Sequence, residues 1–185
     1  MNKSIVTAFV VGASFSAPAF AQDSAPADLG GFRLEGLATY EGDDGKAIGY
    51  GVGVGYDVQA GGAVLGIEAE AIKPGDEECA TDALGKLCLR TDRDLYVGGR
   101  VGAAVAPNIL VYAKAGYTHV RLQGDFDPVT GASSSFKNDL DGVRVGGGIQ
   151  LGLGRNLYVK GEYRYSNYEQ GFDKHTGAVG VGFKF

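Results

Sequence analysis

The chain has 185 residues, of which 44% are hydrophobic and 21% charged, and this length fits a single domain. Its net charge of −5 at pH 7 argues against a nucleic-acid partner, because phosphates call for a basic surface. Glycine occupies 32 positions, about 17% of the chain against ~7% in an average protein, so the glycines must serve the backbone of the fold.

Residues 1–21 are predicted to form a secretory signal peptide. Lys3 precedes an apolar stretch at 5–13, and small residues lead to Ala21, after which we expect cleavage. A membrane anchor is the alternative, but the apolar stretch is well short of the ~20 residues that a spanning helix needs. The predicted mature chain then begins with a short segment at 22–31.

Cys79 and Cys88 are the two cysteines of the sequence, and they lie in an acidic stretch rich in turn-forming residues. An exported protein meets an oxidising compartment, where this pair is expected to form a disulfide. A metal site is the alternative, but a structural zinc site needs four ligands, and no histidine lies near the two cysteines in the sequence.

From residue 32 onward, apolar and polar or small residues alternate with a period of two, which predicts β-strands. These segments reach the ~9–11 residues with which a tilted strand crosses a bilayer, and several run longer. Tight turns and mostly longer loops alternate between them, which predicts an up-and-down order with two unlike ends. The eight predicted strands are 32–41, 46–58, 63–73, 92–106, 109–123, 139–154, 156–168 and 174–185.

Each predicted strand has one apolar face and one face that combines glycine with charged residues. In the last segment Val179, Val181, Phe183 and Phe185 share a face opposite glycine, alanine and Lys184. A soluble barrel or sandwich would show the same alternation. Glycine on an exposed strand face costs entropy and packs nothing, whereas inside a narrow cylinder it makes room for long side chains. We therefore predict that the apolar face points outward, toward lipid.

The charged residues of the other face are predicted to lie inside the cylinder. Six are basic and five acidic, close to the balance that a buried ion-pair network needs. Glu68 and Glu70 are expected to pair with Arg100, Arg144 and Lys160. The predicted interior charges are Arg33, Glu35, Asp57, Glu68, Glu70, Arg100, Lys114, Arg144, Lys160, Glu162 and Arg164.

Aromatic residues fall on the predicted outward face, mostly near strand ends. Aromatic girdles mark the two interfaces of a membrane barrel at such positions. The residues concerned are Phe32, Tyr40, Tyr56, Tyr117, Tyr163, Tyr165, Phe183 and Phe185.

The segments GRVGAAVAPNILVYAKAGY, NLYVKGEYRYSNY and GAVGVGFKF resemble the eight-stranded outer-membrane β-barrels. The chain is similar to the OmpA-like transmembrane domain, and more closely to the small porin-family, opacity-like barrels of Gram-negative bacteria. The resemblance covers residues 32–185 and implies an all-β fold, an eight-stranded antiparallel up-and-down transmembrane β-barrel in the cell outer membrane, with 22–31 on the periplasmic side. It also implies that Val181, Phe183 and Phe185 form the C-terminal signal that the barrel-assembly machinery recognises.

The expected function is structural: a small barrel that stabilises the envelope and presents surface loops. Eight strands enclose an interior that side chains fill, so we predict no large open pore. A narrow or gated path for small solutes is the alternative, and neutralising Arg100 or Arg144 should then change permeability. The expected partners are outer-membrane lipid, lipopolysaccharide and the assembly machinery, and a monomer is the expected state.

An enzyme is the third functional class considered, because some eight-stranded outer-membrane barrels, which this chain resembles, modify the lipid of lipopolysaccharide. Such chemistry needs a nucleophile beside a base. His119 and His175 could combine with Ser166 or Thr176, but no motif places these residues together. We predict no catalytic residue and no cofactor.

The predicted outer loops are rich in carboxylates, which normally form a solvated surface. Alternatively, some of them hold Ca²⁺ or Mg²⁺ that bridges lipopolysaccharide phosphates, because hard divalent ions favour oxygen ligands. The spacing of an EF-hand is absent, so no defined metal site is predicted. The residues are Asp43, Asp44, Asp76, Glu77, Glu78, Asp125 and Asp127.

Overall fold

A computed structural model of the chain describes residues 29–41, 47–75, 77–81, 85–128 and 134–185. The predicted signal peptide lies outside these ranges. The elements that they form are β1 (Gly31–Glu41), β2 (Ala47–Ala60), β3 (Ala63–Lys73), β4 (Glu77–Thr81), β5 (Gly85–Ala106), β6 (Ile109–Pro128), β7 (Ser134–Gly152), β8 (Leu157–Tyr168), the 3-10 helix η1 (Glu169–Gly171) and β9 (Asp173–Lys184).

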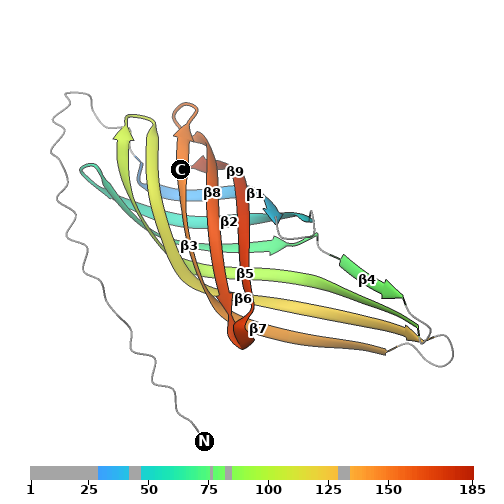
Figure 1. Ribbon diagram of the computed structural model, residues 1–185. Helices are drawn as coiled ribbons and strands as arrows, with labels where there is room; N and C mark the ends of the chain where they lie inside the picture. The colour runs from blue at the N-terminus through green and yellow to red at the C-terminus, as the bar shows by residue number, and fades with distance from the viewer. Residues whose placement is uncertain (1–28, 42–46, 76, 82–84, 129–133) are drawn as a thin grey trace, which may run out of the picture.

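Eight of the strands form a closed ring (Figure 1). Their order is β3-β2-β1-β9-β8-β7-β6-β5, and pairing between β3 and β5 closes it. All neighbours are antiparallel, and β4 pairs with β5 beside the ring. The predicted eight-stranded up-and-down barrel is therefore confirmed. Among the described residues, no helix has the length and hydropathy that a membrane crossing requires.

Three strands are longer than the sequence predicts. β5 begins at residue 85 instead of 92, β6 ends at 128 instead of 123, and β7 begins at 134 instead of 139. Their outer parts pair with one another and, through β5, with β4, beyond the end of the ring (Figure 1, lower right). Ser134 to Asp139 are exposed on both faces of β7, so this part of the strand carries no apolar alternation by which it could be recognised.

Tight turns join the strands at the opposite end. Residues 107–108 form a two-residue connection, as predicted, and the connection predicted at 59–62 is shortened to 61–62 because β2 runs to Ala60. Gly61 has a φ of 60°, which residues other than glycine rarely adopt. A third short connection precedes β8 and contains Gly154, whose φ is 129°. The ring therefore has one end with short connections and one end with an extended sheet.

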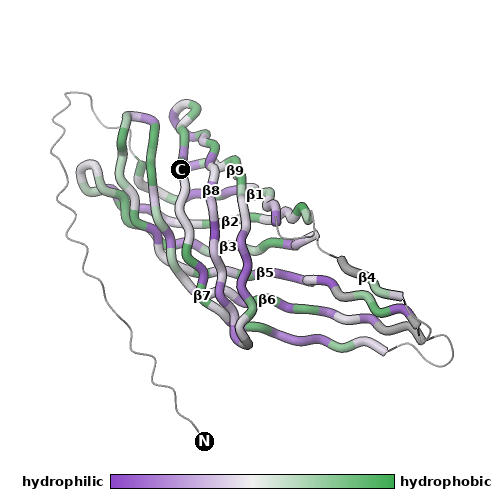
Figure 2. The backbone as a smooth tube through the Cα atoms, in the orientation of Figure 1, coloured by the Kyte–Doolittle hydropathy of each residue, from purple (hydrophilic) through white to green (hydrophobic). Residues whose placement is uncertain are grey.

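Buried and exposed side chains alternate along the strands. The hydropathy of successive residues changes along the same strands (Figure 2). Val179 and Phe183 are 63% and 52% exposed, whereas Arg100 and Arg144 are 4% and 2% exposed. A soluble barrel would have the reverse arrangement. The predicted orientation is confirmed, and an apolar outer surface of this kind requires hydrocarbon around it.

Inward-facing glycines lie opposite the bulkiest inward side chains. Arg33 is in register with Gly55, and Tyr158 is in register with Gly182. A Cβ atom on Gly55 would lie 2.6 Å from Nη2 of Arg33, and one on Gly182 would overlap the Tyr158 ring. The glycines thus provide the interior space into which the charged and aromatic side chains extend.

Candidate functional site

The interior of the ring, called the lumen from here on, holds a dense set of buried charges. Among the described residues, seven buried basic side chains face six buried acidic ones. All eleven predicted interior charges are buried there, together with Asp94 and Lys184. The complete set is Arg33, Arg100, Lys114, Arg144, Lys160, Arg164 and Lys184 with Glu35, Asp57, Glu68, Glu70, Asp94 and Glu162.

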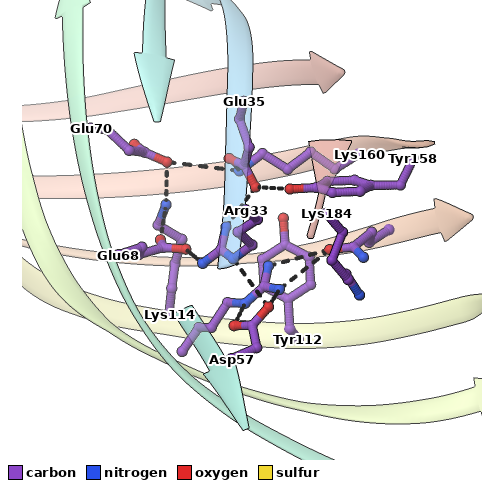
Figure 3. Close-up of polar contacts among 12 residues, drawn as sticks. Arg33, Glu35, Asp57, Glu68, Glu70, Tyr112, Lys114, Tyr158, Lys160 and Lys184 are labelled. Atoms are coloured by element: carbon purple, nitrogen blue, oxygen red, sulfur yellow. Dashed lines mark hydrogen bonds and ion pairs between the residues drawn. The ribbon is translucent and has the colours of Figure 1, made fainter. Parts of the chain in front are cut away.

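Lys114 on β6 joins the carboxylates of β3 in the middle of the lumen (Figure 3). Its Nζ lies 2.5 Å from Glu68 and 2.8 Å from Glu70. Arg164 on β8 contacts Glu70 at 2.9 Å and also binds Glu162 on its own strand. Charges from opposite walls therefore meet directly, and the middle of the lumen is occupied by ion pairs.

Lys160 connects the same network to β1. Its Nζ lies 2.5 Å from Glu35 and 2.9 Å from Glu162. Glu35 and Glu162 thus each have more than one cationic partner, which offsets the large cost of removing these charges from water.

A second group of charges lies toward the end with the tight turns. Arg33 contacts Glu35 at 2.5 Å, Glu68 at 2.6 Å and Asp57 at 3.1 Å. Arg100 also binds Asp57 through two of its nitrogens. Arg33 therefore links this group to the central ion pairs.

A third group lies toward the outer end of the lumen. Arg144 contacts Asp94 at 2.6 Å and donates to the hydroxyls of Ser166 at 2.8 Å and Tyr168 at 3.2 Å. The Thr118 hydroxyl donates to Asp94 at 3.1 Å. Asp94 is thus paired within the outer part of the network.

The predicted partners of Glu68 and Glu70 were correct only in part. Lys160 approaches Glu70 at 3.8 Å, as expected. Arg100 and Arg144 instead form their ion pairs with Asp57 and Asp94, and Lys114 contacts Glu68 and Glu70.

Tyrosines take part in the network, although the sequence analysis assigned them no role. Tyr112 donates to Glu162 at 2.5 Å, and Tyr158 donates to Glu35 at 2.6 Å. The Lys114 ammonium also lies 4.5 Å from the ring centre of Tyr96, within range of a cation–π contact. These tyrosines lie on the same strand face as the charged residues, so the alternation of the sequence could have predicted that they point into the lumen.

Two apolar clusters lie beyond the two ends of the ion pairs. One combines Leu29 with Val64, Leu110 and Tyr112 near the tight turns. Leu29 is held there by its backbone, which donates to Oε1 of Gln59 at 2.6 Å and accepts from Nζ of Lys184 at 2.9 Å.

The other cluster lies toward the outer end and consists of Val120, Leu140 and Tyr168, with Leu122 packed against it. The described lumen is therefore polar in the middle and apolar toward both ends.

The extended sheet outside the ring contains the predicted disulfide between Cys79 and Cys88, which is confirmed. The two cysteines face each other in the register of β4 and β5. The disulfide therefore holds the β4–β5 hairpin together.

Of the acidic residues predicted in the outer loops, Asp125 lies 3.6 Å from Arg90. Asp43, Asp44 and Asp76 fall outside the described residues.

The two histidines do not meet the hydroxyl groups considered as nucleophiles. His119 lies on the outer face, where its Nδ1 is 2.7 Å from Asp141, and His175 contacts the hydroxyl of Tyr163 at 2.6 Å. Ser166 and Thr176 are buried on the inward face. The strands thus separate each histidine from these hydroxyls, and no nucleophile and base pair forms among these four residues.

Val181 and Phe183 on the last strand, and Phe185 directly after it, have exposed side chains on the outer face. The ring of Phe185 lies 6.2 Å from that of Phe32 and 6.5 Å from that of Phe183. The end of the chain thus joins an aromatic group at the end with the tight turns.

Comparison with known proteins agrees with this architecture. Residues 7–185 match the family described as outer membrane protein beta-barrel domain. The 22 kDa outer membrane protein of Rhizobium leguminosarum bv. viciae is 30% identical over 173 residues, which cover 84% of this chain and 77% of that protein. A match of this extent shows the family.

Solved structures of low sequence identity share the fold. Ail of Yersinia pestis, solved with the heparin analogue sucrose octasulfate, is 15% identical with a TM-score of 0.55, covering 84% of this chain and 97% of Ail. The N-terminal β-barrel domain of Pseudomonas aeruginosa OprF is 14% identical with a TM-score of 0.56, covering 84% of this chain and 98% of that domain. The protein described here belongs to the outer-membrane β-barrel domain family and is a protein of the outer membrane.

Proposed function

We propose that this protein is a structural barrel of the outer membrane, closed to solutes, that displays a small sheet at the cell surface. The observation that carries the proposal is the network of ion pairs from Asp57 to Asp94, which fills the lumen between two apolar clusters. Buried ion pairs with several partners each are costly to separate. A hydrated ion would have to break them and then pass apolar side chains.

The extended sheet supports the second part of the proposal. β5, β6 and β7 continue beyond the ring, and the disulfide joins β4 to β5 there. Longer connections of outer-membrane barrels lie on the extracellular side. The proposed role includes no catalytic step.

Electrical recording tests the closed lumen. We expect purified protein, folded into a planar bilayer, to give no stable current steps. Lys114→Ala/Arg164→Ala removes two long side chains from the middle of the lumen and should produce ion currents. The control Arg90→Ala/Lys137→Ala removes two charges from the outer sheet and should stay silent. Folding of each sample is checked by gel, on which the unboiled barrel should run faster than the boiled protein. Uniform current steps from the folded, unaltered protein would overturn the proposal.

A narrow path for small solutes is the second candidate. The observation in its favour is that, among the described residues, the buried hydroxyls of Thr39 and Tyr96 have no hydrogen-bond partner. Buried polar groups normally find one, so water or a small polar solute at these positions would satisfy them. Liposome swelling in a small sugar, compared between the unaltered protein and Arg144→Gln, separates the candidates. A gated path predicts altered swelling, whereas a closed barrel predicts lower stability with no swelling.

We also propose that the barrel-assembly machinery recognises the C-terminal strand. The support is that Val181 and Phe183 near the end of β9, and Phe185 directly after it, have exposed side chains.

A further inference from the structure

Three basic side chains occupy one lateral row on the outer face of the barrel. Arg93 on β5 is directly opposite Arg121 on β6. The ladder between β3 and β5 ends at the pair Ile72 and Asp94, and Lys73 and Arg93 are the chain neighbours of these two residues. The row therefore crosses three adjacent strands, which are spaced ~4.8 Å apart.

The row lies at the outer edge of the apolar band. Arg93 follows the outward alternation of Leu95 and Val97, which are 36% and 56% exposed. Lys73 is opposite Tyr50, whose ring is exposed on the outer face. Tyrosines concentrate at the level of lipid headgroups. The cations of the row are thus placed where hydrocarbon gives way to headgroups.

The charges of the row are only partly neutralised within the protein. Arg121 donates to Asp139 at 2.7 and 3.1 Å, and Asp92 lies within electrostatic range of Arg121. Lys73 and Arg93 enter none of the ion pairs found in the described ranges, although Asp139 lies within electrostatic range of Arg93. Nε of Arg93 is buried without a hydrogen-bond partner there. Like charges directly opposite one another destabilise a sheet. An anion bound across the row would remove that repulsion.

We propose that Lys73, Arg93 and Arg121 bind the phosphate group of a lipid in the outer leaflet. Phosphate oxygens accept charge-assisted hydrogen bonds from arginine and lysine. The acyl chains of such a lipid would lie along the apolar face below the row, beside Leu95 and Val97. The membrane supplies this phosphate at a high local concentration, which favours a lipid over a free anion. The inference does not depend on whether the lumen conducts.

Lipid binding to the purified protein in uncharged detergent micelles tests the site. Native mass spectrometry would count bound phosphatidylglycerol, with zwitterionic phosphatidylcholine as the comparison lipid. Lys73→Gln/Arg93→Gln/Arg121→Gln should weaken phosphatidylglycerol binding by about tenfold or more. The control Lys86→Gln/Lys137→Gln/Arg155→Gln removes the same charge from exposed positions elsewhere and should bind as the unaltered protein does. Asp139→Asn should tighten binding, because it frees Arg121 for the phosphate.

Three results would overturn the site as stated. Equal loss in both triple variants would show a general effect of charge. Equal binding of the two lipids would show that the headgroup phosphate is not recognised. Displacement of the lipid by equimolar inorganic phosphate would show a free-anion site. Should the triple variant fail to fold, Arg93→Gln must weaken binding while Arg93→Lys retains it.

Discussion

The guanidinium of Arg33 on β1 donates to the carboxylate of Glu68 on β3 at 2.6 Å, across the inward face of the strand between them. Arg33 also contacts Glu35 and Asp57, so one side chain neutralises three carboxylates. Removal of one partner from a buried ion pair leaves an uncompensated charge, which costs more than the net contribution of the intact pair.

Replacement of Arg33 should therefore destabilise the barrel strongly. We expect Arg33→Met to lower the free energy of unfolding by ~3–5 kcal/mol. The double variant Arg33→Met/Glu68→Leu should recover part of that loss, because it also removes one of the carboxylates left unpaired. Urea unfolding in lipid vesicles measures both. Arg155→Met, in an exposed turn, is the control, and an equal effect of the two single substitutions would contradict the network.

Glycine inside the lumen should resist substitution far more than glycine on the outer face. A Cβ at Gly182 would overlap the Tyr158 ring, whereas one at Gly161 would meet nothing within 4 Å. We expect Gly182→Val to cost ~1–3 kcal/mol through overpacking, and Gly161→Val to be tolerated in lipid. The unfolding midpoint of each variant decides this, and equal midpoints would refute the space-making role of Gly182.

Loss of the disulfide should loosen the outer sheet and leave the ring intact. The disulfide closes a short loop, so Cys79→Ser/Cys88→Ser should lower the free energy of unfolding of the hairpin by up to about 3 kcal/mol. Hydrogen exchange should accelerate at the amides of β4 and stay slow in β8 and β9. Faster exchange throughout the ring would show that the hairpin stabilises the whole barrel.

The outer sheet should respond to acid through Asp139. Hydrogen bonds from Arg121 hold the pKa of Asp139 below its ordinary value. A carboxylate with a depressed folded pKa contributes stability that is fully present above its unfolded pKa, about 3.9, and is lost as pH falls through the folded value. Contact between β6 and β7 should thus be unchanged from about pH 8 to 5 and weaken below about pH 4.

A carbon NMR titration of the Asp139 carboxyl measures this pKa directly. Arg121→Gln should raise it toward the ordinary value, whereas Arg90→Gln should leave it unchanged. A value that does not respond to Arg121→Gln would rule out the Arg121 hydrogen bonds as the cause.

Phe185→Ala should impair assembly in cells more than it impairs the folded barrel. The exposed ring makes few contacts inside the protein, so refolding into micelles should be nearly unaffected. Yield in the outer membrane should fall several-fold. The exposed Phe172, outside the last strand, is the matched control. Equal cellular yields of Phe185→Ala and Phe172→Ala would count against an assembly signal at the C-terminus.

The sequence by itself determined the eight strands of the ring, their up-and-down order and the face that each presents to lipid. The alternation of apolar residues with glycine and long charged side chains can be read from each segment alone. Inside a narrow barrel the glycines leave room for the long charged side chains, so the face that carries both points inward. The interior positions of Arg33, Lys114 and Arg164 followed from that alternation.

Only the tertiary structure decided the partners within the lumen and the length of the outer sheet. Pairing across the lumen depends on the stagger between strands that are distant in sequence, and this is why Arg100 lies with Asp57 rather than with Glu70. The outer part of β7 is exposed on both faces, so no alternation marks it as a strand. The row of Lys73, Arg93 and Arg121 likewise exists only through strand pairing, because long-range hydrogen bonds, not local patterns, set its register.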